Sequence, residues 1–576
     1  MSALTGHYHR NPTVMLWLMV GLFSSILLPW YGIEDGFFDL EWIIDGYPLD
    51  SDFAPLFFLL GQGEKLWLTP LIMPFFFAFF ALTLPQRSSA FSWALIIGGG
   101  LGLVWMCGQG LSIGIRGWQI ASLQELFGPL DERQFGMGYG AILYFASCLF
   151  LFSTGLAEQR GTMGDKFIIG MICFVVMLVG IFVFYPIIKL IILAFIDEQN
   201  AYSLSLFWEK ISDSRIWSLG CVFAERRCGV AWNTVFMATI VGFLTTTLGL
   251  VFALLVTRTN LRYRRIFRAI SIIPLITPPF VIGLAIILLF GLSGVVSTTI
   301  SDIFGLTPTR WVYGLPGIVI AQTLAYTPIA FLVLIGVVES VSPSLEEAGL
   351  TLRANPSQVF QTVSLPLIRP GLANAFLLGF IESMADFGNP LVLGGNYDVL
   401  STEIFFAIVG AQYDQGRAAV LALVLLSFTL AAFYIQRFWL GRKSYTTITG
   451  KGDSGYNMKL PPLLSQTVIF VGSSWAFFTI VIYSIIVYGS FVEMWGLDNS
   501  LTFKHYITAF SVSIEENSIQ WTGSAWNSFS TTFMIAAIAA PLTAAIGLVT
   551  AYLLTRHNFR GKNAFEFGTM LSFAIP

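Results

Sequence analysis

The sequence predicts an all-α polytopic membrane protein of about 13 spans with a parallel internal repeat. Three observations predict this fold class. Hydrophobic residues make up 56% of the 576 positions and charged residues only 11%, whereas an average soluble protein is roughly 25% charged. The apolar residues form unbroken runs of about twenty, the length of a membrane-spanning helix, rather than the alternating runs of a β-barrel. One fourteen-residue stretch also recurs far along the chain.

Twelve complete spans can be placed, and a thirteenth begins near residue 566. The predicted ranges are 13–33, 66–84, 92–107, 137–157, 168–196, 234–257, 270–292, 313–338, 371–395, 416–436, 466–489 and 527–555. If the N-terminus is cytoplasmic, the cytoplasmic segments hold 19 Lys and Arg against 7 Asp and Glu, and the external segments hold 10 against 24. Because cytoplasmic loops carry the basic excess, we expect this orientation, with loop 34–65 external.

A repeat with a fixed offset of 298 residues organises the chain. Residues 249–262 read GLVFALLVTRTNLR and residues 547–560 read GLVTAYLLTRHNFR, identical at nine of fourteen positions. Six predicted spans separate the copies, so both cross the membrane in the same direction and the repeat is parallel. The expected domains are a four-span extension of unknown role at 1–166, a first repeat at 167–440, a cytoplasmic linker at 441–464 and an incomplete second repeat at 465–576.

The end of the second copy suggests a longer protein. Pro576 aligns with Pro274, and the first copy continues past Pro274 through further spans that flank a polar loop. We therefore expect the native gene to encode roughly another hundred or more residues, including a second loop of the same kind.

That polar loop, residues 339–370, is the longest polar cytoplasmic segment of the first repeat. Its sequence predicts two short amphipathic helices. In the first, 344–352, Ser344 is positioned as the N-cap and Glu347 completes a capping box. The second, 356–363, begins at a proline and should end at Leu365-Pro366. Helices this short are not stable alone in water. The loop therefore either binds a partner surface or packs on the lipid headgroups.

The loop resembles the coupling loop of ATP-binding-cassette (ABC) import permeases, known for its Glu-Ala-Ala motif. The matching letters are EEAG at 346–349, NP at 355–356 and VSLPL at 363–367. Coupling residues implied by the resemblance are Glu346, Glu347, Ala348, Gly349, Arg353, Leu365 and Pro366. Tyr185-Pro186, LPLIRPG at 365–371 and the pattern from Glu382 to Pro390 are similar to the ferric-iron branch, in which two permease domains are fused.

Two positions depart from the family pattern. Gly349 stands where the second alanine is usual, and Arg353 stands where a glycine is usual. Glycine readily adopts a left-handed turn. Arg353 therefore implies a different turn geometry or an added contact.

Two carboxylates, Glu382 and Asp386, fall inside a predicted span. Their i, i+4 spacing places them on one helix face, and charged groups at membrane depth usually face a bundle interior or a wet cavity. They either line a translocation path, where a cation could bind transiently, or form a structural pair with neighbouring helices and with backbone freed by Gly388 and Pro390. The sequence predicts no fixed metal site and no bound cofactor.

Cys221 and Cys228 share one external loop and either form a disulfide in an oxidising compartment or remain free thiols.

The motifs that the sequence lacks exclude several functions. The chain contains no GxxxxGK[ST] phosphate-binding motif and no nucleophile–base constellation, so we expect no catalytic residues. Its net charge of −3 argues against a nucleic-acid partner.

The resemblance implies a transport subunit without its own ATPase site, located in the bacterial inner membrane. Its expected partners are the lipid bilayer, a cytoplasmic ABC ATPase dimer that uses ATP and Mg²⁺, and a periplasmic solute-binding protein. Ferric iron is the leading substrate, and an anionic organic solute such as a sugar phosphate is the alternative. The rival class is an ion-coupled secondary transporter, in which parallel repeats also occur. A membrane enzyme or receptor would need residue clusters or a soluble domain that the sequence lacks.

Overall fold

The computed structural model describes residues 11–32, 41–43, 47–48, 54–63, 65–86, 88–114, 117–130, 136–159, 165–196, 202–223, 228–411, 413–440, 458–496, 498–515 and 518–571. Within them, eleven helical segments are long and apolar enough to cross a membrane. The shorter apolar helix α1 (Pro12–Leu27) matches the first predicted span, and α25 (Lys562–Leu571) begins close to the thirteenth. The predicted all-α membrane fold is confirmed. Loop 34–65 and linker 441–464 lie largely outside the described residues.

The chain divides into two compact units, which we describe separately. Unit 1 comprises residues 1–181 and 539–566, and unit 2 comprises residues 182–538 and 567–576. The elements of unit 1 after α1 are the 3-10 turn Glu41–Ile43, α2 (Leu56–Gln62), the 3-10 helix Leu66–Ile72, α3 (Met73–Thr83), α4 (Ser89–Ser112), β1 (Ile113–Gly114), β2 (Gly117–Trp118), α5 (Ala121–Phe127), α6 (Tyr139–Gln159) and α7 (Lys166–Val179). Helix α24 (Ser524–Arg556) crosses the boundary between the units.

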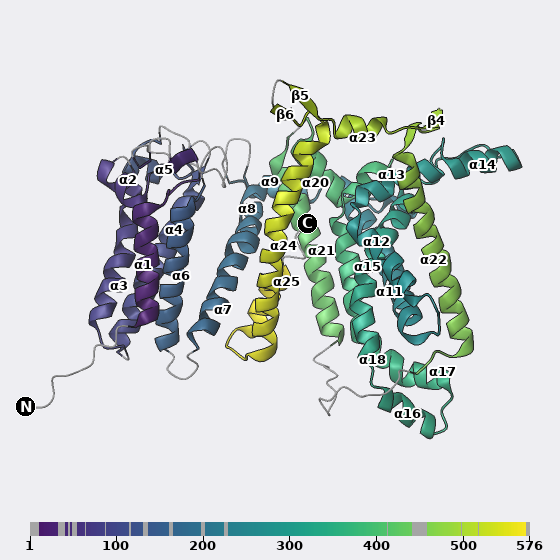
Figure 1. Ribbon diagram of the computed structural model, residues 1–576, viewed down its shortest axis with the longest axis horizontal. Helices are drawn as coiled ribbons and strands as arrows, with labels where there is room; N and C mark the ends of the chain where they lie inside the picture. Colours follow the sequence, from purple (N-terminus) through teal and green to yellow (C-terminus); the bar gives the residue numbers. More distant parts are fainter. Residues whose placement is uncertain are drawn as a thin grey trace, which may run out of the picture. The chain divides into compact units, whose positions relative to one another are not determined.

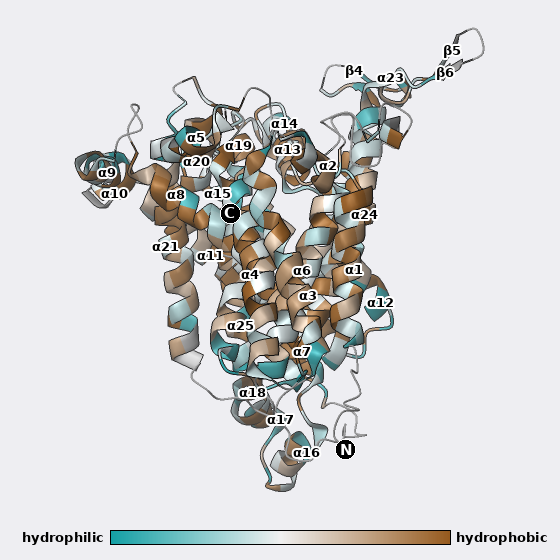
Figure 2. Cartoon of the chain, turned by 90° about the vertical axis from the view of Figure 1, so that its left-hand side faces the viewer, coloured by the Kyte–Doolittle hydropathy of each residue, from teal (hydrophilic) through white to brown (hydrophobic). Residues whose placement is uncertain are grey.

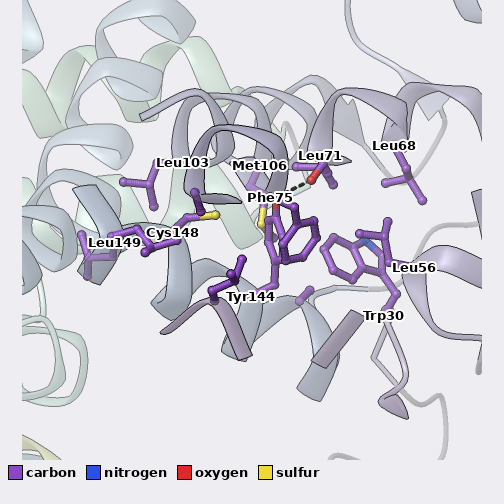
Figure 3. Packing of buried hydrophobic residues seen from close by; sticks show 14 of the residues in the cluster. Trp30, Leu56, Leu68, Leu71, Phe75, Leu103, Met106, Tyr144, Cys148 and Leu149 are labelled. Atoms are coloured by element: carbon purple, nitrogen blue, oxygen red, sulfur yellow. Dashed lines mark hydrogen bonds between the residues drawn. The ribbon is translucent and has the colours of Figure 1, made fainter. Parts of the chain in front are cut away.

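An apolar core centred on Tyr144 holds the first helices of unit 1 together (Figure 3). The Tyr144 ring contacts Trp30 and Phe75 edge-on, and its buried hydroxyl donates a 2.6 Å hydrogen bond to the carbonyl of Leu71. This bond satisfies the one polar group that the ring carries into the core. Helices α4 and α6 also approach closely at Gly99, where an added Cβ would lie 2.6 Å from the carbonyl oxygen of Cys148.

The π-helical segment Gly180–Phe184 and α25 also cross the boundary between the units, and unit 2 holds the remaining elements. They are α8 (Tyr185–Ala194), α9 (Leu204–Ile211), α10 (Ser214–Trp217), the 3-10 turn Gly220–Phe223, α11 (Val230–Arg258), α12 (Arg264–Ile276), α13 (Pro279–Phe290), α14 (Val295–Phe304), α15 (Leu315–Glu339), α16 (Pro343–Thr351), α17 (Pro356–Val359), the π-helical segment Phe360–Ser364, α18 (Leu365–Ala385), α19 (Gly388–Leu393), α20 (Leu400–Val409), α21 (Gln415–Leu440), α22 (Pro462–Gly489), β3 (Val492–Met494), β4 (Asp498–Leu501), α23 (Lys504–Ala509), β5 (Ser513–Glu515) and β6 (Ser518–Gln520).

Small residues let the central helices of unit 2 pack closely. An added Cβ at Gly249 of α11 would lie 2.8 Å from the Cβ of Ala330 and 2.9 Å from the backbone nitrogen of Phe331, both in α15. An added Cβ at Gly242 would lie 3.2 Å from the carbonyl oxygen of Phe376 in α18. Helix α11 is therefore held between α15 and α18 by direct backbone approach. Helices α16 and α17 lie at one end of unit 2, and α14 and α23 lie at the other (Figure 1).

The strands are short and local. Each of the three pairs, β1 with β2, β3 with β4 and β5 with β6, is antiparallel. Figure 2 colours the long helices mainly brown, as expected when a membrane replaces water around them.

Three predicted helix boundaries were wrong. Span 270–292 is two helices, α12 and α13, because Pro278 and Pro279 follow each other and Thr277 before them is extended. The predicted helix end at Leu365-Pro366 does not exist. The helix continues through the π-helical segment Phe360–Ser364 into α18, and this wider turn accommodates a proline that lacks an N–H group. Span 371–395 breaks at Asp386, which is the C-cap of α18.

The helices that contain the repeated sequence end at corresponding residues. Helix α11 ends at Arg258 and α24 at Arg556, and the following helices begin at Arg264 and Lys562. Both pairs keep the offset of 298 residues. These ends agree with the predicted repeat, which elsewhere stays a prediction.

Gly249→Ala should destabilise unit 2, because its Cβ would meet α15 at less than normal contact distance. We expect a loss of roughly 1–3 kcal/mol, measured as a lower thermal unfolding midpoint of the detergent-purified chain of residues 1–576. Gly547, 298 residues later, is the matched control, since a Cβ there meets no described atom within 4 Å. Gly547→Ala should leave the midpoint unchanged or raise it slightly, because alanine favours helix. An unchanged midpoint for Gly249→Ala would contradict the packing argument.

Candidate functional site

Residues 340–364, the part of the predicted loop 339–370 that lies between α15 and α18, form two short helices at one end of unit 2 (Figure 1). We call this part the loop segment. Its outer surface is mainly polar but includes three open apolar side chains, since Leu345, Leu350 and Leu352 are 47%, 39% and 83% exposed. Glu347 and Ala348 are exposed beside them. An exposed apolar surface on a short polar loop is typical of an interaction site.

The first helix of the loop segment does not begin as predicted. Helix α16 starts at Pro343 with Ser342 as its N-cap, and no side-chain capping bond is formed there. Ser344 lies inside the first turn, and its hydroxyl is 2.7 Å from that of Ser342. The Ser344–Glu347 capping box was therefore wrong, because proline at the first helical position moves the start of the helix one residue earlier.

A capping box does form at α17. The side chain of Asn355 accepts a 2.8 Å hydrogen bond from the backbone N–H of Gln358, and the side chain of Gln358 accepts one of 2.9 Å from the backbone N–H of Asn355. This reciprocal pair satisfies donors at the start of the helix that would otherwise lack partners.

The two departures from the family pattern have structural explanations. Arg353 has a φ of 63°, so it adopts the left-handed turn that glycine usually provides. Of the two alternatives given by the sequence, a different turn geometry or an added contact, the first does not hold, and the arginine adopts a conformation unusual for a residue with a side chain. Gly349 packs against Val359 of α17, where an added Cβ would lie 3.0 Å from a Val359 methyl group. Alanine at position 349 would force this contact apart.

A buried ion pair attaches the loop segment to the rest of unit 2. Glu346 is 1% exposed and Arg258, at the end of α11, is 5% exposed. The Arg258 Nη1 lies 2.8 Å from Oε1 and 2.6 Å from Oε2 of Glu346. Burying both charges removes their hydration, so the pair is stable only when further hydrogen bonds complete it.

Three neighbours supply most of those bonds, although the Nε of Arg258 has no partner among the described residues. The Ser364 hydroxyl donates a 2.6 Å hydrogen bond to Oε1 of Glu346, and the backbone N–H of Met458 donates one of 3.1 Å to Oε2. Arg258 in turn donates to the carbonyls of Met458 and Val338, each at 3.2 Å. The backbone N–H of Leu460 donates to the carbonyl of Arg258 at 3.3 Å. The network thus joins α11, the loop segment and the residues that lead into α22.

A second buried polar centre surrounds Asp386, which is 8% exposed. Its Oδ1 accepts hydrogen bonds from the backbone N–H groups of Gly388 and Asn389, at 2.9 and 3.3 Å. Its Oδ2 accepts from the side-chain amides of Asn389 and Gln322, at 2.7 and 2.9 Å. Asp386 therefore caps α19 and ties it to α15. This geometry favours the structural role that the sequence left open.

Glu382 has a different environment. Its side chain is half-buried, one turn before the end of α18. Within the described part of the chain, its carboxylate has no hydrogen-bond or ion-pair partner. Glu382 and Asp386 therefore do not form an equivalent pair, because Asp386 leaves the helix and turns its acceptors toward α15 and α19.

The described residues contain no group of three or more His, Cys, Asp or Glu side chains that could hold a metal ion. Cys221 and Cys228 form a disulfide, which decides between the two states considered from the sequence.

Comparison with known proteins identifies the family. Residues 245–443 match the family described as binding-protein-dependent transport system inner membrane component. A putative ferric transport system permease protein of Haemophilus influenzae is 41% identical over 455 residues, which cover 79% of this chain and 69% of that protein. The chain belongs to this permease family.

Two further proteins are similar to parts of the permease. The ferric transport system permease protein of Actinobacillus pleuropneumoniae is 41% identical over 440 residues, 76% of this chain and 61% of that protein. The chain thus spans about two thirds of the length of these relatives. A solved bacterial alginate ABC transporter, in complex with an alginate-bound periplasmic protein, is 20% identical, with a TM-score of 0.40 over 49% of this chain and 97% of that one.

The site of the permease contains residues that the sequence analysis missed. Arg258 was counted only as a positive charge, although it recurs in the repeat as Arg556. An arginine that recurs at the same position of two otherwise apolar stretches is the signal that could have identified Arg258 as a site residue. Gln322 and Asn389, the amide partners of Asp386, gave no signal, since single amides in apolar segments are common. The predicted coupling residues Leu365 and Pro366 lie at the start of α18, outside the exposed surface of α16.

Removing one member of the buried pair should destabilise the permease. Arg258→Ala or Glu346→Ala leaves an unpaired buried charge, at an expected cost of about 3–5 kcal/mol. The double variant Arg258→Met, Glu346→Met should recover part of this loss, because no isolated charge remains. The partly exposed pair of Arg417 and Glu403 is the control, and Arg417→Ala should cost under about 1 kcal/mol. Thermal unfolding in detergent measures all four variants. Equal losses at Arg258 and Arg417 would contradict the buried-pair argument.

Proposed function

We propose that this permease is the membrane-spanning subunit of an ATP-driven ABC importer that takes up ferric iron. The observation that carries the proposal is the 41% identity with ferric transport permeases over 79% of the chain. This similarity favours ferric iron over a sugar phosphate as the substrate. Membership of a binding-protein-dependent family favours an ABC importer over an ion-coupled secondary transporter.

The proposed partners are those of the family. A cytoplasmic ATPase dimer, which would bind ATP and Mg²⁺, docks on the exposed surface of α16 through Leu345, Leu350 and Leu352, with Glu347 as the charged contact. A periplasmic binding protein delivers the substrate to the opposite end. The expected orientation, with the N-terminus and the loop segment cytoplasmic, follows from the distribution of Lys and Arg.

Coupling of ATP hydrolysis to transport depends on how a displacement of the loop segment is transmitted to the membrane helices. When the ATPase closes and displaces α16, Glu346 moves with that helix. The buried pair passes the displacement to α11 through Arg258 and to the start of α22 through Met458. Packed elements with fixed polar contacts move together rather than deform. Each turnover would thus shift helices on both sides of linker 441–464.

Substrate passage is assigned to the region of Glu382. A half-buried carboxylate without a described partner is available to a passing cation, and Fe³⁺ is a hard cation that prefers oxygen ligands. Binding there would be transient, since the described residues offer no cluster that could hold a metal ion.

The proposal is tested by uptake of radiolabelled ferric iron in cells that carry the permease with its ATPase and binding protein. Glu347→Lys should abolish uptake while the protein still inserts, and the ATPase should detach or hydrolyse ATP without transport. Glu209→Lys makes the same charge change at an exposed residue of α9 and should leave uptake unchanged. Normal uptake by Glu347→Lys would remove the case for docking through α16.

Substitutions at the two carboxylates test the substrate. Glu382→Gln should reduce ferric uptake without changing thermal stability, because the side chain makes no described bond. Asp386→Asn is not a neutral replacement, since it sets an NH₂ group against donors and should destabilise the protein by about 1–3 kcal/mol. Uptake of a labelled sugar phosphate is the comparison: improved sugar phosphate uptake by Glu382→Gln would indicate an anionic substrate.

A further inference from the structure

A polar cavity of about 350 Å³ opens beside the loop segment in unit 2. It forms where the ends of α11 and α15 meet the first turns of α12. Its lining residues are Val256, Thr257, Arg264, Arg265, Arg268 and Glu339. The volume lies within the roughly 300–1,000 Å³ range of small-molecule pockets, and the cavity is separate from the buried pair and from the Glu382 region.

The cavity has a strong positive charge. Three guanidinium groups and one carboxylate line it, a net charge of about +2 at neutral pH. Within the described part of the chain, no hydrogen bond or ion pair engages the side chains of Arg264, Arg265 or Arg268. Arginine binds phosphate oxygens in a planar, two-pronged geometry. Three arginines in one cavity therefore indicate a phosphate-bearing ligand, and Glu339 adds an acceptor for a hydroxyl group on it.

The surrounding residues place the cavity at the membrane surface. Tyr263 and Ile266 are 59% and 54% exposed beside the arginines, and Ile276 at the far end of α12 is 82% exposed. In a membrane protein, exposed apolar side chains of this kind face lipid. Helix α12 thus begins with its arginines at headgroup level and continues along the acyl chains.

The predicted repeat offers a sequence comparison for these arginines. The second copy keeps Arg258 and Arg262 as Arg556 and Arg560, so the turn itself is retained. At the three lining positions, however, it has Lys562, Asn563 and Glu566 in place of Arg264, Arg265 and Arg268. Helix α25 still begins at Lys562. The arginine cluster is therefore specific to the first copy.

We propose that this cavity binds the headgroup of an anionic glycerophospholipid of the phosphatidylglycerol type from the adjacent leaflet. The phosphodiester lies among Arg264, Arg265 and Arg268, and a glycerol hydroxyl of the headgroup donates to Glu339. Basic pockets between the ends of membrane helices bind anionic headgroups in this way. The bound lipid would connect α11, α12 and α15 next to the loop segment.

The test uses the full chain of residues 1–576 in nanodiscs of phosphatidylcholine with increasing fractions of phosphatidylglycerol or phosphatidylethanolamine. Native mass spectrometry counts the lipids that remain bound. The wild type should retain phosphatidylglycerol in preference to both other lipids. Arg264→Gln, Arg265→Gln and Arg268→Gln should each weaken retention by about tenfold, the loss expected for one hydrogen bond to a charged group. Since these side chains are exposed, the variants should fold.

Arg262→Gln is the matched control, because Arg262 is exposed in the same turn but does not line the cavity. It should leave retention unchanged. An equal loss of phosphatidylglycerol retention in Arg262→Gln would mean that the arginines attract the lipid only through their overall charge, and it would contradict a specific site in the cavity. Equal retention of the three lipids by the wild type would overturn the headgroup assignment. Displacement of the lipid by millimolar glycerol phosphate or inorganic phosphate would identify a soluble anion as the ligand and overturn the lipid source.

Discussion

The buried contact between Arg258 and Glu346 fixes the position of everything at the loop end of unit 2. Two opposite charges buried away from water attract each other strongly. They tolerate little displacement, because each hydrogen bond that is lost leaves part of their desolvation free energy uncompensated. The pair therefore holds α16 at one orientation on α11. Through Met458 and Leu460 it also holds the residues before α22 against the same point. The positions of the exposed leucines of α16 therefore depend on the buried side chain of Glu346.

Much of the fold could be predicted from the sequence, because apolar runs of the right length have few alternatives in a membrane. The predicted spans correspond to helices throughout the described residues, and the disulfide was one of two states considered. The errors concern backbone choices that neighbours decide. Pro278 broke a predicted helix, whereas Pro366 did not, because the π-helical segment before it leaves room for the ring. The consecutive prolines at 278 and 279 are a local signal for the first outcome, whereas nothing near Pro366 announces the π-helical segment.

The candidate site was predicted in outline but not in its chemistry. The motif pointed to loop 339–370 and emphasised Glu347 for docking, which stays a prediction, whereas Glu346 makes the buried contacts. Arg353 shows the opposite error: a non-glycine residue adopts the left-handed region, in a turn closed by local backbone hydrogen bonds to Leu350 and Gly349. Asp386 and Glu382 looked equivalent at i, i+4 spacing. However, the carboxylate of Asp386 accepts four hydrogen bonds, whereas that of Glu382 accepts none within the described residues. Pairing partners that are distant in sequence, such as Gln322, decide such roles, and a single sequence does not reveal them.

The break in α18 at Asp386 has an electrostatic consequence. The carbonyl end of a helix carries roughly half an elementary negative charge, contributed by peptide dipoles that point the same way. The predicted span 371–395 would place this end within the membrane, where its field would be only weakly screened. Glu382 occupies the last turn of that helix, so its carboxylate and the helix end act in the same direction. Both contribute negative potential near Glu382, which the N-terminus of α19 partly offsets, because that helix begins at Gly388.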